Sequence, residues 1–230
     1  MLKAQKKITK RELKQDALLT TVVKATSFYE QHKKNIGIAV GVLAAIVVGS
    51  FIYAKNKADN NEKATAALGK VYTYFDNAQY KIAVDGLPER NIMGLKAIVE
   101  NYGNTDSGNL AKFYLAGAYF ELGNYDEALK YFEDFSPNDQ LTAVSRLAGI
   151  AGCYEAKGEF EKAAEYFEKA ALNYPNDVDA AENLNAAASN YALAGKKERA
   201  LELYRKLKKD YPTTAFGREA DRHIARLSAT

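Results

Sequence analysis

The 230-residue sequence is poor in the side chains that most often carry enzyme chemistry. Its one cysteine, Cys153, can form no disulfide within the chain, so the sequence neither requires nor excludes an oxidising compartment. Its two histidines, His32 and His223, stand near opposite ends of the chain, which argues against a metal site or an acid–base pair between them. There is no phosphate loop of Walker spacing and no serine in a nucleophile elbow. We therefore expect no enzymatic activity, no cofactor, no metal and no small-molecule substrate.

The remaining candidates for chemistry have structural explanations. Cys153 follows Gly152 where a helix pair needs small residues, so we interpret it as a packing residue. Glu155, Glu161 and Glu165 recur at helical spacing, which is typical of a solvated helix face. No nucleophile or base accompanies them.

Charge is distributed unevenly along the chain. Residues 1–34 hold nine basic and three acidic residues, a net charge of +6, whereas the rest of the chain carries −3. Because the rest of the chain has no basic stripe, we expect it to bind no nucleic acid. The basic excess belongs to the amino-terminal tail alone.

Residues 35–54 contain no charged side chain. A helix of this length, at about 1.5 Å per residue, crosses a hydrocarbon core of about 30 Å. The basic region before it is too long for a signal peptide, and Ile52 is too bulky for cleavage after Ala54. The sequence therefore predicts an uncleaved transmembrane helix.

The basic excess before this span predicts its orientation. The positive-inside rule places the amino terminus in the cytoplasm and the rest of the chain outside, although Lys55 and Lys57 reduce the contrast. Within the tail, apolar residues from Leu13 to Phe28 follow a helical stripe, with Lys14 and Lys24 off it. Such a helix suits an anionic membrane surface, or it simply leads to the span in solvent.

One face of the predicted span consists of small residues, which are Gly37, Gly41, Ala45 and Gly49. Small residues let a second membrane helix approach closely. The face predicts contact with another protein's helix or with a second copy of the chain. Alternatively, it reflects only the general abundance of glycine in membrane helices.

Two later stretches, residues 147–175 and 184–212, repeat one pattern at a shift of 37 residues, and a third copy lies 35 residues upstream. The matching residues of the first stretch are Leu147, Ile150, Ala151, Tyr154, Gly158, Phe160, Ala163, Phe167, Ala170 and Pro175. Those of the second are Leu184, Ala187, Ala188, Tyr191, Gly195, Ala200, Tyr204, Leu207 and Pro212. Those of the upstream copy are Leu115, Ala116, Tyr119, Gly123, Tyr125, Ala128 and Phe132.

This spacing predicts a pair of antiparallel helices in each copy. Apolar residues at steps of three and four line the first helix, glycine ends it, and alanine five residues later lies where the helices cross. Pro175 and Pro212 end the second helix. In period and in residue type at each position, the pattern resembles the tetratricopeptide repeat.

The predicted fold is all-α, with one transmembrane helix followed by a short tetratricopeptide-repeat solenoid. We expect a helix over 55–84 and a degenerate first repeat, broken by a Gly- and Pro-containing loop and completed by a helix over Ile92 to Tyr102. The predicted divisions are a basic tail over 1–34, the span over 35–54, a linker helix and degenerate repeat over 55–108, three repeats over 109–212 and a capping helix over 213–230.

The repeat register also predicts a concave binding surface for protein partners, made by first-helix residues that point away from the second helix. Its members are Leu110, Phe113, Gly117, Phe120, Glu121, Ser145, Ala148, Gly152, Glu155, Glu182, Asn185 and Ser189. Phe113 and Phe120 are either anchors for an apolar partner segment or packing residues under the preceding repeat. Some repeat proteins grip a terminal carboxylate with lysine, asparagine and arginine on this face, and those places here hold Phe113, Gly117, Gly149, Glu182 and Ala186. We therefore expect no binding of a carboxylate tail in that way, but an amide-rich or apolar partner surface.

The order of parts resembles the ancillary subunit of the bacterial Sec translocon. The repeats are also similar to those of the periplasmic cell-division coordinator, which share the Tyr211-Pro212-Thr213 ending. The first resemblance implies an inner-membrane scaffold that passes exported proteins from the channel to periplasmic chaperones. The alternative is a structural subunit of another inner-membrane complex, docked through its span. The longer tail and the insertion around residues 85–94 depart from the first pattern.

Overall fold

The computed structural model describes residues 10–173 and 179–229. It divides into two compact units, Met1–Asn56 and Lys57–Thr230, and the first helix contributes residues to both. The elements in chain order are α1 (Lys10–Asp76), α2 (Tyr80–Asp85), β1 (Gly86–Leu87), the 3₁₀ turn η1 (Pro88–Arg90), β2 (Ile92–Met93), α3 (Leu95–Tyr102), α4 (Asp106–Glu121), α5 (Tyr125–Asp134), α6 (Gln140–Ala156), α7 (Phe160–Asn173), α8 (Asp179–Leu193), α9 (Lys197–Asp210) and α10 (Ala215–Ser228).

In the first unit, α1 leaves its apolar side chains uncovered. Leu43 is 62% exposed, Val47 67% and Phe51 71%, although residues of these types are normally buried in a folded protein. By length and composition, α1 is the one helix in the described part of the chain that is able to cross a membrane. This uncovered stretch coincides with the uncharged residues 35–54.

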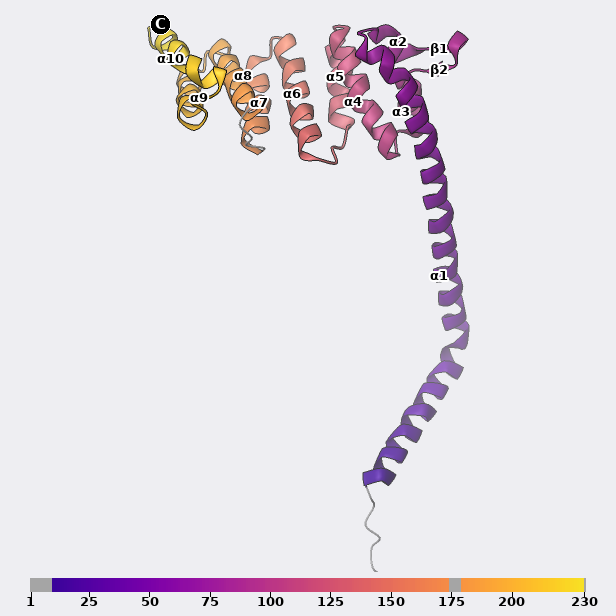
Figure 1. Cartoon of the computed structure of the whole chain (residues 1–230). Helices are drawn as coiled ribbons and strands as arrows, with labels where there is room; N and C mark the ends of the chain where they lie inside the picture. The colour runs from indigo at the N-terminus through magenta and orange to yellow at the C-terminus, as the bar shows by residue number, and fades with distance from the viewer. Residues whose placement is uncertain (1–9, 174–178, 230) are drawn as a thin grey trace, which may run out of the picture. The chain divides into compact units, whose positions relative to one another are not determined.

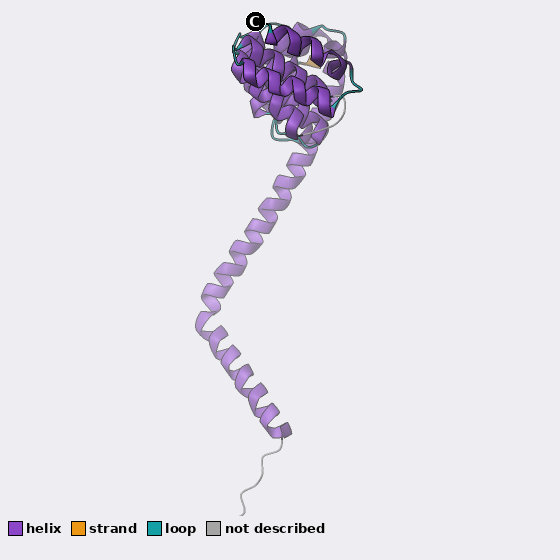
Figure 2. Ribbon diagram, turned by 90° about the vertical axis from the view of Figure 1, so that its left-hand side faces the viewer, coloured by secondary structure: helices purple, strands orange, loops and turns teal. Residues whose placement is uncertain are grey.

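In the second unit, helices pair as the sequence predicts. α4 packs with α5, α6 with α7, and α8 with α9, and the pairs follow one another in a row (Figure 1). Seen from the side, the described residues of this unit are mostly helical, with loops between the helices and one small strand region (Figure 2). The all-α solenoid is confirmed, and no strand occurs in the described residues between Asp106 and Asp210.

The turn between the two helices of each pair has the predicted left-handed glycine. Gly123, Gly158 and Gly195 have φ angles of 75°, 75° and 74°. In each turn the residue after the glycine donates its backbone N–H to a carbonyl five residues back, for example from Asn124 to Tyr119 at 2.8 Å. The alanines that permit close crossing are fully buried, namely Ala116, Ala128, Ala151, Ala163, Ala188 and Ala200.

The first hairpin differs from the prediction of one continuous helix over 55–84. The helix stops at Asp76, and Ala78 takes a φ of 56°, so a left-handed turn forms without glycine. Gln79 then donates to the carbonyl of Tyr74 at 2.8 Å, the same closing bond as in the later repeats. Burial of apolar residues on both sides of the turn, including Val71 and Ala83, stabilises this conformation despite the alanine.

The insertion in the first hairpin also differs from the prediction. The second helix begins at Leu95 rather than at Ile92, because Ile92 and Met93 form β2 and pair antiparallel with β1. The degenerate repeat therefore consists of the end of α1, α2, a two-stranded ribbon and α3. The ribbon is the only strand structure in the described residues.

The carboxy-terminal helix α10 covers the last repeat as predicted. Ala220 is fully buried, and Phe216, Ile224 and Leu227 pack on the same core cluster, while Arg218, Arg222 and Arg226 are exposed. Pro212 follows α9, which ends at Asp210. Pro175 lies outside the described residues.

Candidate protein-interaction surface

Four of the predicted surface residues come together in one groove. Ser145 and Glu155 on α6 and Glu182 on α8 line a hollow of about 410 Å³ between the first helices of two successive repeats. Ala148 of the predicted set lines it as well. We call this hollow the α6–α8 groove, and its full lining is Leu141, Val144, Ser145, Ala148, Glu155, Phe167, Asp179, Glu182, Asn183 and Ala186.

The two aromatic candidates are half-buried and pack against neighbouring residues of the repeats. Phe113 lies 5.7 Å from the ring of Phe132 and 5.3 Å from that of Phe135, so it leans on the second helix of its own repeat and not away from it. Phe120 lies against Gly152 of the next repeat, where a Cβ atom would be 3.3 Å from the ring. Phe75 has the same relation to Gly117. An aromatic ring on one repeat thus fills the space that a glycine leaves on the next.

The other predicted residues are dispersed. Leu110 lines a separate hollow of about 240 Å³ together with Phe135 and Asp139. The Ser189 hydroxyl is 2.8 Å from that of Tyr204 on α9, so Ser189 also faces the second helix of its repeat. The remaining members outside the groove are Glu121, which is exposed at the end of α4, and Asn185, which is half-buried on α8.

Two carboxylates of the α6–α8 groove differ in how they are held. Glu155 accepts a 2.9 Å hydrogen bond from the side-chain amide of Asn190, which is fully buried. The same amide group donates to the carbonyl of Ala186 at 3.0 Å. Glu182, in contrast, is exposed and makes no hydrogen bond or ion pair within the described residues. One carboxylate is fixed by the protein, and the other is available.

Sequence reasoning missed most of the groove's apolar wall. Leu141 stands at its rim with 66% of its surface exposed, although leucine is a residue type that usually avoids water. Val144 and Phe167 line its interior. Phe167 comes from α7, the second helix of its repeat, so a search along first helices alone does not find it. An apolar residue at the start of a predicted amphipathic helix is the only signal that points to Leu141.

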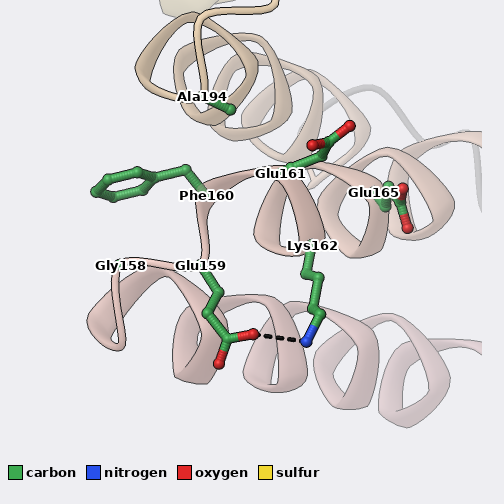
Figure 3. A pocket seen from close by; sticks show the side chains of 7 residues that line it. All are labelled: Gly158, Glu159, Phe160, Glu161, Lys162, Glu165 and Ala194. Atoms are coloured by element: carbon green, nitrogen blue, oxygen red, sulfur yellow. Dashed lines mark hydrogen bonds and ion pairs between the residues drawn. The ribbon is translucent and has the colours of Figure 1, made fainter.

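A second hollow, of about 570 Å³, lies at the turn of the α6–α7 repeat (Figure 3). Gly158, Glu159, Phe160 and Lys162 come from the turn and the first residues of α7, while Ala194 comes from the next repeat. Glu159 and Lys162 form an ion pair at 2.6 Å, drawn as a dashed line in Figure 3. Glu161, which also lines the hollow, pairs with Lys196 at 2.8 Å, and Glu165 is exposed.

A buried polar cluster joins the last two repeats. Glu168 on α7 accepts a 3.1 Å hydrogen bond from the Tyr191 hydroxyl and forms an ion pair with Arg199 on α9. Burial, together with the nearby Glu168 carboxylate, raises the pKa of Tyr191 to about 12. The cluster satisfies a carboxylate that is only 9% exposed, and it fixes the relative position of three helices.

The small-residue face of α1 is open in the first unit. A Cβ atom placed on Gly37, Gly41 or Gly49 would meet nothing within 4 Å. Ala45 lies between Gly41 and Gly49 in the same helix and is exposed as well. The predicted helix-packing face is therefore uncovered within the described residues of the first unit.

The described residues contain no group of three or more metal-ligating side chains. Cys153 is fully buried in the core of a repeat, and its burial raises the pKa of the thiol to about 11. A thiol in that state is a poor nucleophile at neutral pH. What the second unit offers is a set of surfaces between helices, and this defines it as an α-solenoid suited to contact with other polypeptides.

The comparisons with known proteins agree with this class. Residues 26–173 match the model of the tetratricopeptide repeat-like domain, and residues 183–214 match that of the tetratricopeptide repeat. The chain belongs to the tetratricopeptide repeat-like domain family. The first match begins ahead of the uncharged stretch, so the family pattern includes that stretch as well as the first repeats.

Solved structures show the same fold. One similar structure holds the nearly identical TPR-like repeats of a protein described as a kinesin light chain from Podosopora anserina. It is 17% identical, covers 73% of this chain and 86% of that one, and superposes with a TM-score of 0.57. A single-residue variant of that protein, also 17% identical, covers 73% and 85% with a TM-score of 0.56. No curated protein matches the chain.

Proposed function

We propose that this protein is a membrane-anchored scaffold of the bacterial cell envelope, which binds other proteins through its repeats. The observation that carries the proposal is the stretch 35–54 of α1, whose apolar side chains are exposed in the first unit, in the same polypeptide as a repeat domain with an open groove. An exposed apolar stretch of this length is stable in lipid and costly in water. We infer a single-pass inner-membrane protein.

The charge distribution supports an orientation with the amino terminus in the cytoplasm and the repeats in the periplasm. The tail before the span carries +6 and the chain after it −3. Protease added to spheroplasts should digest the repeats and leave the tail intact. Protection of the whole chain while the membrane is sealed would reverse this topology.

A role beside the Sec translocon is the finer form of this proposal. A basic tail, one uncleaved span and exported repeats are the parts that the ancillary translocon subunit would need in order to hand exported proteins to periplasmic chaperones. The test is chemical crosslinking in intact cells, followed by mild detergent extraction and identification of the captured chains. We expect channel subunits and periplasmic chaperones among them. Recovery of the chain as a lone monomer in several detergents would contradict the scaffold itself.

The open glycine face of the span supports a second candidate function, that of a structural subunit docked through its membrane helix. Gly37, Gly41 and Gly49 leave room for another helix, and close contact between helices drives association in lipid. Changing the three glycines to leucine separates the two functions. Loss of partners with folded repeats indicates docking by the span, and retention of partners indicates docking by the repeats.

A further inference from the structure

The α6–α8 groove has an apolar interior with acidic groups around it. Val144, Ala148, Phe167 and Ala186 supply the apolar surface, and Leu141 extends it to a highly exposed rim. The lining also contains three carboxylates, those of Glu155, Asp179 and Glu182, and it contains no lysine, arginine or histidine. A segment that binds in the groove must therefore cover apolar surface and also neutralise negative charge.

Within the described residues, neither Glu155 nor Glu182 pairs with a cation. The two lysines of α7 are engaged elsewhere, Lys162 with Glu159 at 2.6 Å and Lys169 over the Tyr166 ring. Helix α8 has no basic residue at all. The only one on α6, Arg146, donates to the backbone carbonyls of Phe132 and Glu133 at 2.8 and 3.0 Å, toward α5. Lys157, which follows α6, pairs with Asp126 at 2.5 Å. Residues 106–195 as a whole carry fifteen acidic and six basic residues, so the local field is negative as well.

One of these carboxylates is also held in place before any partner arrives. The buried amide of Asn190 bonds to Glu155 on one wall and to the Ala186 carbonyl on the other, and both of these residues line the groove. This connection fixes the Glu155 side chain and ties α6 to α8. Preorganisation of this kind reduces the entropy that binding must overcome.

We propose that the α6–α8 groove binds a partner polypeptide segment that presents a lysine or arginine beside a large apolar side chain. The inference rests on the proposed scaffold function and specifies the chemistry of its partner. It differs from the expectation of an amide-rich or apolar partner surface, because the fold gathers Glu155 and Glu182 of the predicted surface into one groove with Asp179. The cation pairs with Glu155 and Glu182, and the apolar side chain lies against Leu141, Val144 and Phe167.

The first test measures binding of short fluorescein-labelled peptides to the full-length chain in detergent by fluorescence anisotropy. The probe peptide contains leucine, lysine and glycine. One control peptide has glutamate in place of lysine, and the other has serine in place of leucine. We expect only the lysine–leucine peptide to bind, and more weakly as salt is raised. Equal binding of the glutamate peptide, or no binding of the lysine–leucine peptide, would overturn the proposed partner chemistry.

Variants then place the peptide in the groove. The double change Glu155→Gln and Glu182→Gln should weaken binding about three- to tenfold, which is the size expected for two partly exposed ion pairs. Glutamine at position 155 can still accept the Asn190 hydrogen bond, so the fold is retained. The matched control is Glu133→Gln with Glu165→Gln, which removes the same charge from α5 and α7 outside the groove. Equal losses in both double variants would refute the assignment to the groove.

The apolar contact has its own pair of variants. Leu141→Ser should weaken the peptide severalfold at little cost in stability, because the side chain is mostly exposed. Leu122→Ser, which changes another exposed leucine at the end of α4, should leave binding unchanged. If Leu141→Ser has no effect, the apolar half of the proposal is wrong.

A photo-crosslinking amino acid at Ser145 distinguishes failure of this inference from failure of the scaffold function. Crosslinks to a partner that persist in the Glu155→Gln and Glu182→Gln variant would support the scaffold and refute the cationic segment. Absence of crosslinks from every position on the repeats would refute the scaffold. Crosslinks to the basic tail of a second copy would make the chain itself the occupant and would refute a foreign partner.

Discussion

The Tyr191 hydroxyl on α8 donates a 3.1 Å hydrogen bond to the Oε2 atom of Glu168 on α7, and Arg199 on α9 holds the other oxygen. The carboxylate is thus shared by three helices that belong to two repeats. Each partner compensates the cost of burying a charge that has only a small exposed fraction. This bond is the clearest polar link between successive repeats, and it leads to the first prediction.

Changing Tyr191 to phenylalanine should lower the free energy of unfolding by about 1.5 kcal/mol, the typical value for a hydrogen bond to a charged group. It should also change the response to alkali. Because the folded-state pKa of Tyr191 is about 12 and the ordinary value is 10.0, its contribution is complete below pH 10 and is lost as the pH rises toward 12. Urea unfolding from pH 8 upward measures both effects. Tyr125→Phe is the control. If the Tyr191→Phe variant loses as much stability in alkali as the unchanged protein does, the alkaline loss does not come from Tyr191.

The left-handed turn at Ala78 predicts opposite effects of glycine and alanine in two equivalent turns. Ala78→Gly should stabilise the repeat unit by about 0.5–1 kcal/mol, since alanine is strained at positive φ and glycine is not. Gly158→Ala should destabilise it by about 1 kcal/mol, and no atom lies within 4 Å of the new Cβ to add a clash. Urea denaturation of each variant measures the two signs. Changes in the same direction would show that packing, not backbone conformation, controls these turns.

Thr105 caps α4, and its hydroxyl makes two bonds that valine cannot replace. The Oγ1 atom accepts from the Gly108 N–H at 3.1 Å and donates to the Tyr102 carbonyl at 2.8 Å, in a side chain that is 4% exposed. Thr105→Val should cost about 1–2 kcal/mol of stability at nearly constant volume. Thr105→Ser keeps the hydroxyl and should cost less than half of that. Thermal unfolding of both variants at one pH measures the two losses. An equal loss in both variants would show that the hydroxyl bonds do not account for the cost.

The buried thiol of Cys153 should be unreactive in the folded protein. It is fully buried, and its pKa of about 11 leaves little thiolate at neutral pH. We expect an aromatic disulfide reagent to react only after denaturant unfolds the repeat, with a rate that follows the unfolding transition. Rapid reaction of the native chain at pH 7 would show that this repeat opens locally far more often than its packing indicates.

The repeats could be predicted from sequence because their signals are local. Gly123, Gly158 and Gly195 mark three turns, and small residues at fixed distances mark three crossings. The turn at Ala78 gave a weaker signal, because alanine is a strong helix former and only the preceding Asp76 and Asn77 favour a turn. Contacts with residues far along the chain, such as Leu95 and Leu115, stabilise the break instead.

The α6–α8 groove was only partly predictable for the same reason. Ser145, Glu155 and Glu182 follow from the repeat register, but the direction of a side chain depends on what the neighbouring repeat leaves empty. Gly152 makes room for Phe120, so that half-buried ring packs against the next repeat. The register alone places Phe120 and Glu155 at the same position of successive repeats, although only Glu155 lines the groove. The neighbours of a side chain in the next repeat decide whether it packs against that repeat or lines the groove.

The small ribbon in the first hairpin leaves and rejoins the helices at almost the same point. A Cβ atom on Gly86 would lie 2.5 Å from the Gly94 nitrogen, and one on Gly94 would lie 2.3 Å from the Val84 carbonyl oxygen. Since the two ends nearly touch, the length of the loop between them has little influence on α2 and α3. The exposed tip at Glu89 and Arg90 is therefore a natural place to insert an epitope or a small fluorescent domain without disturbing the solenoid.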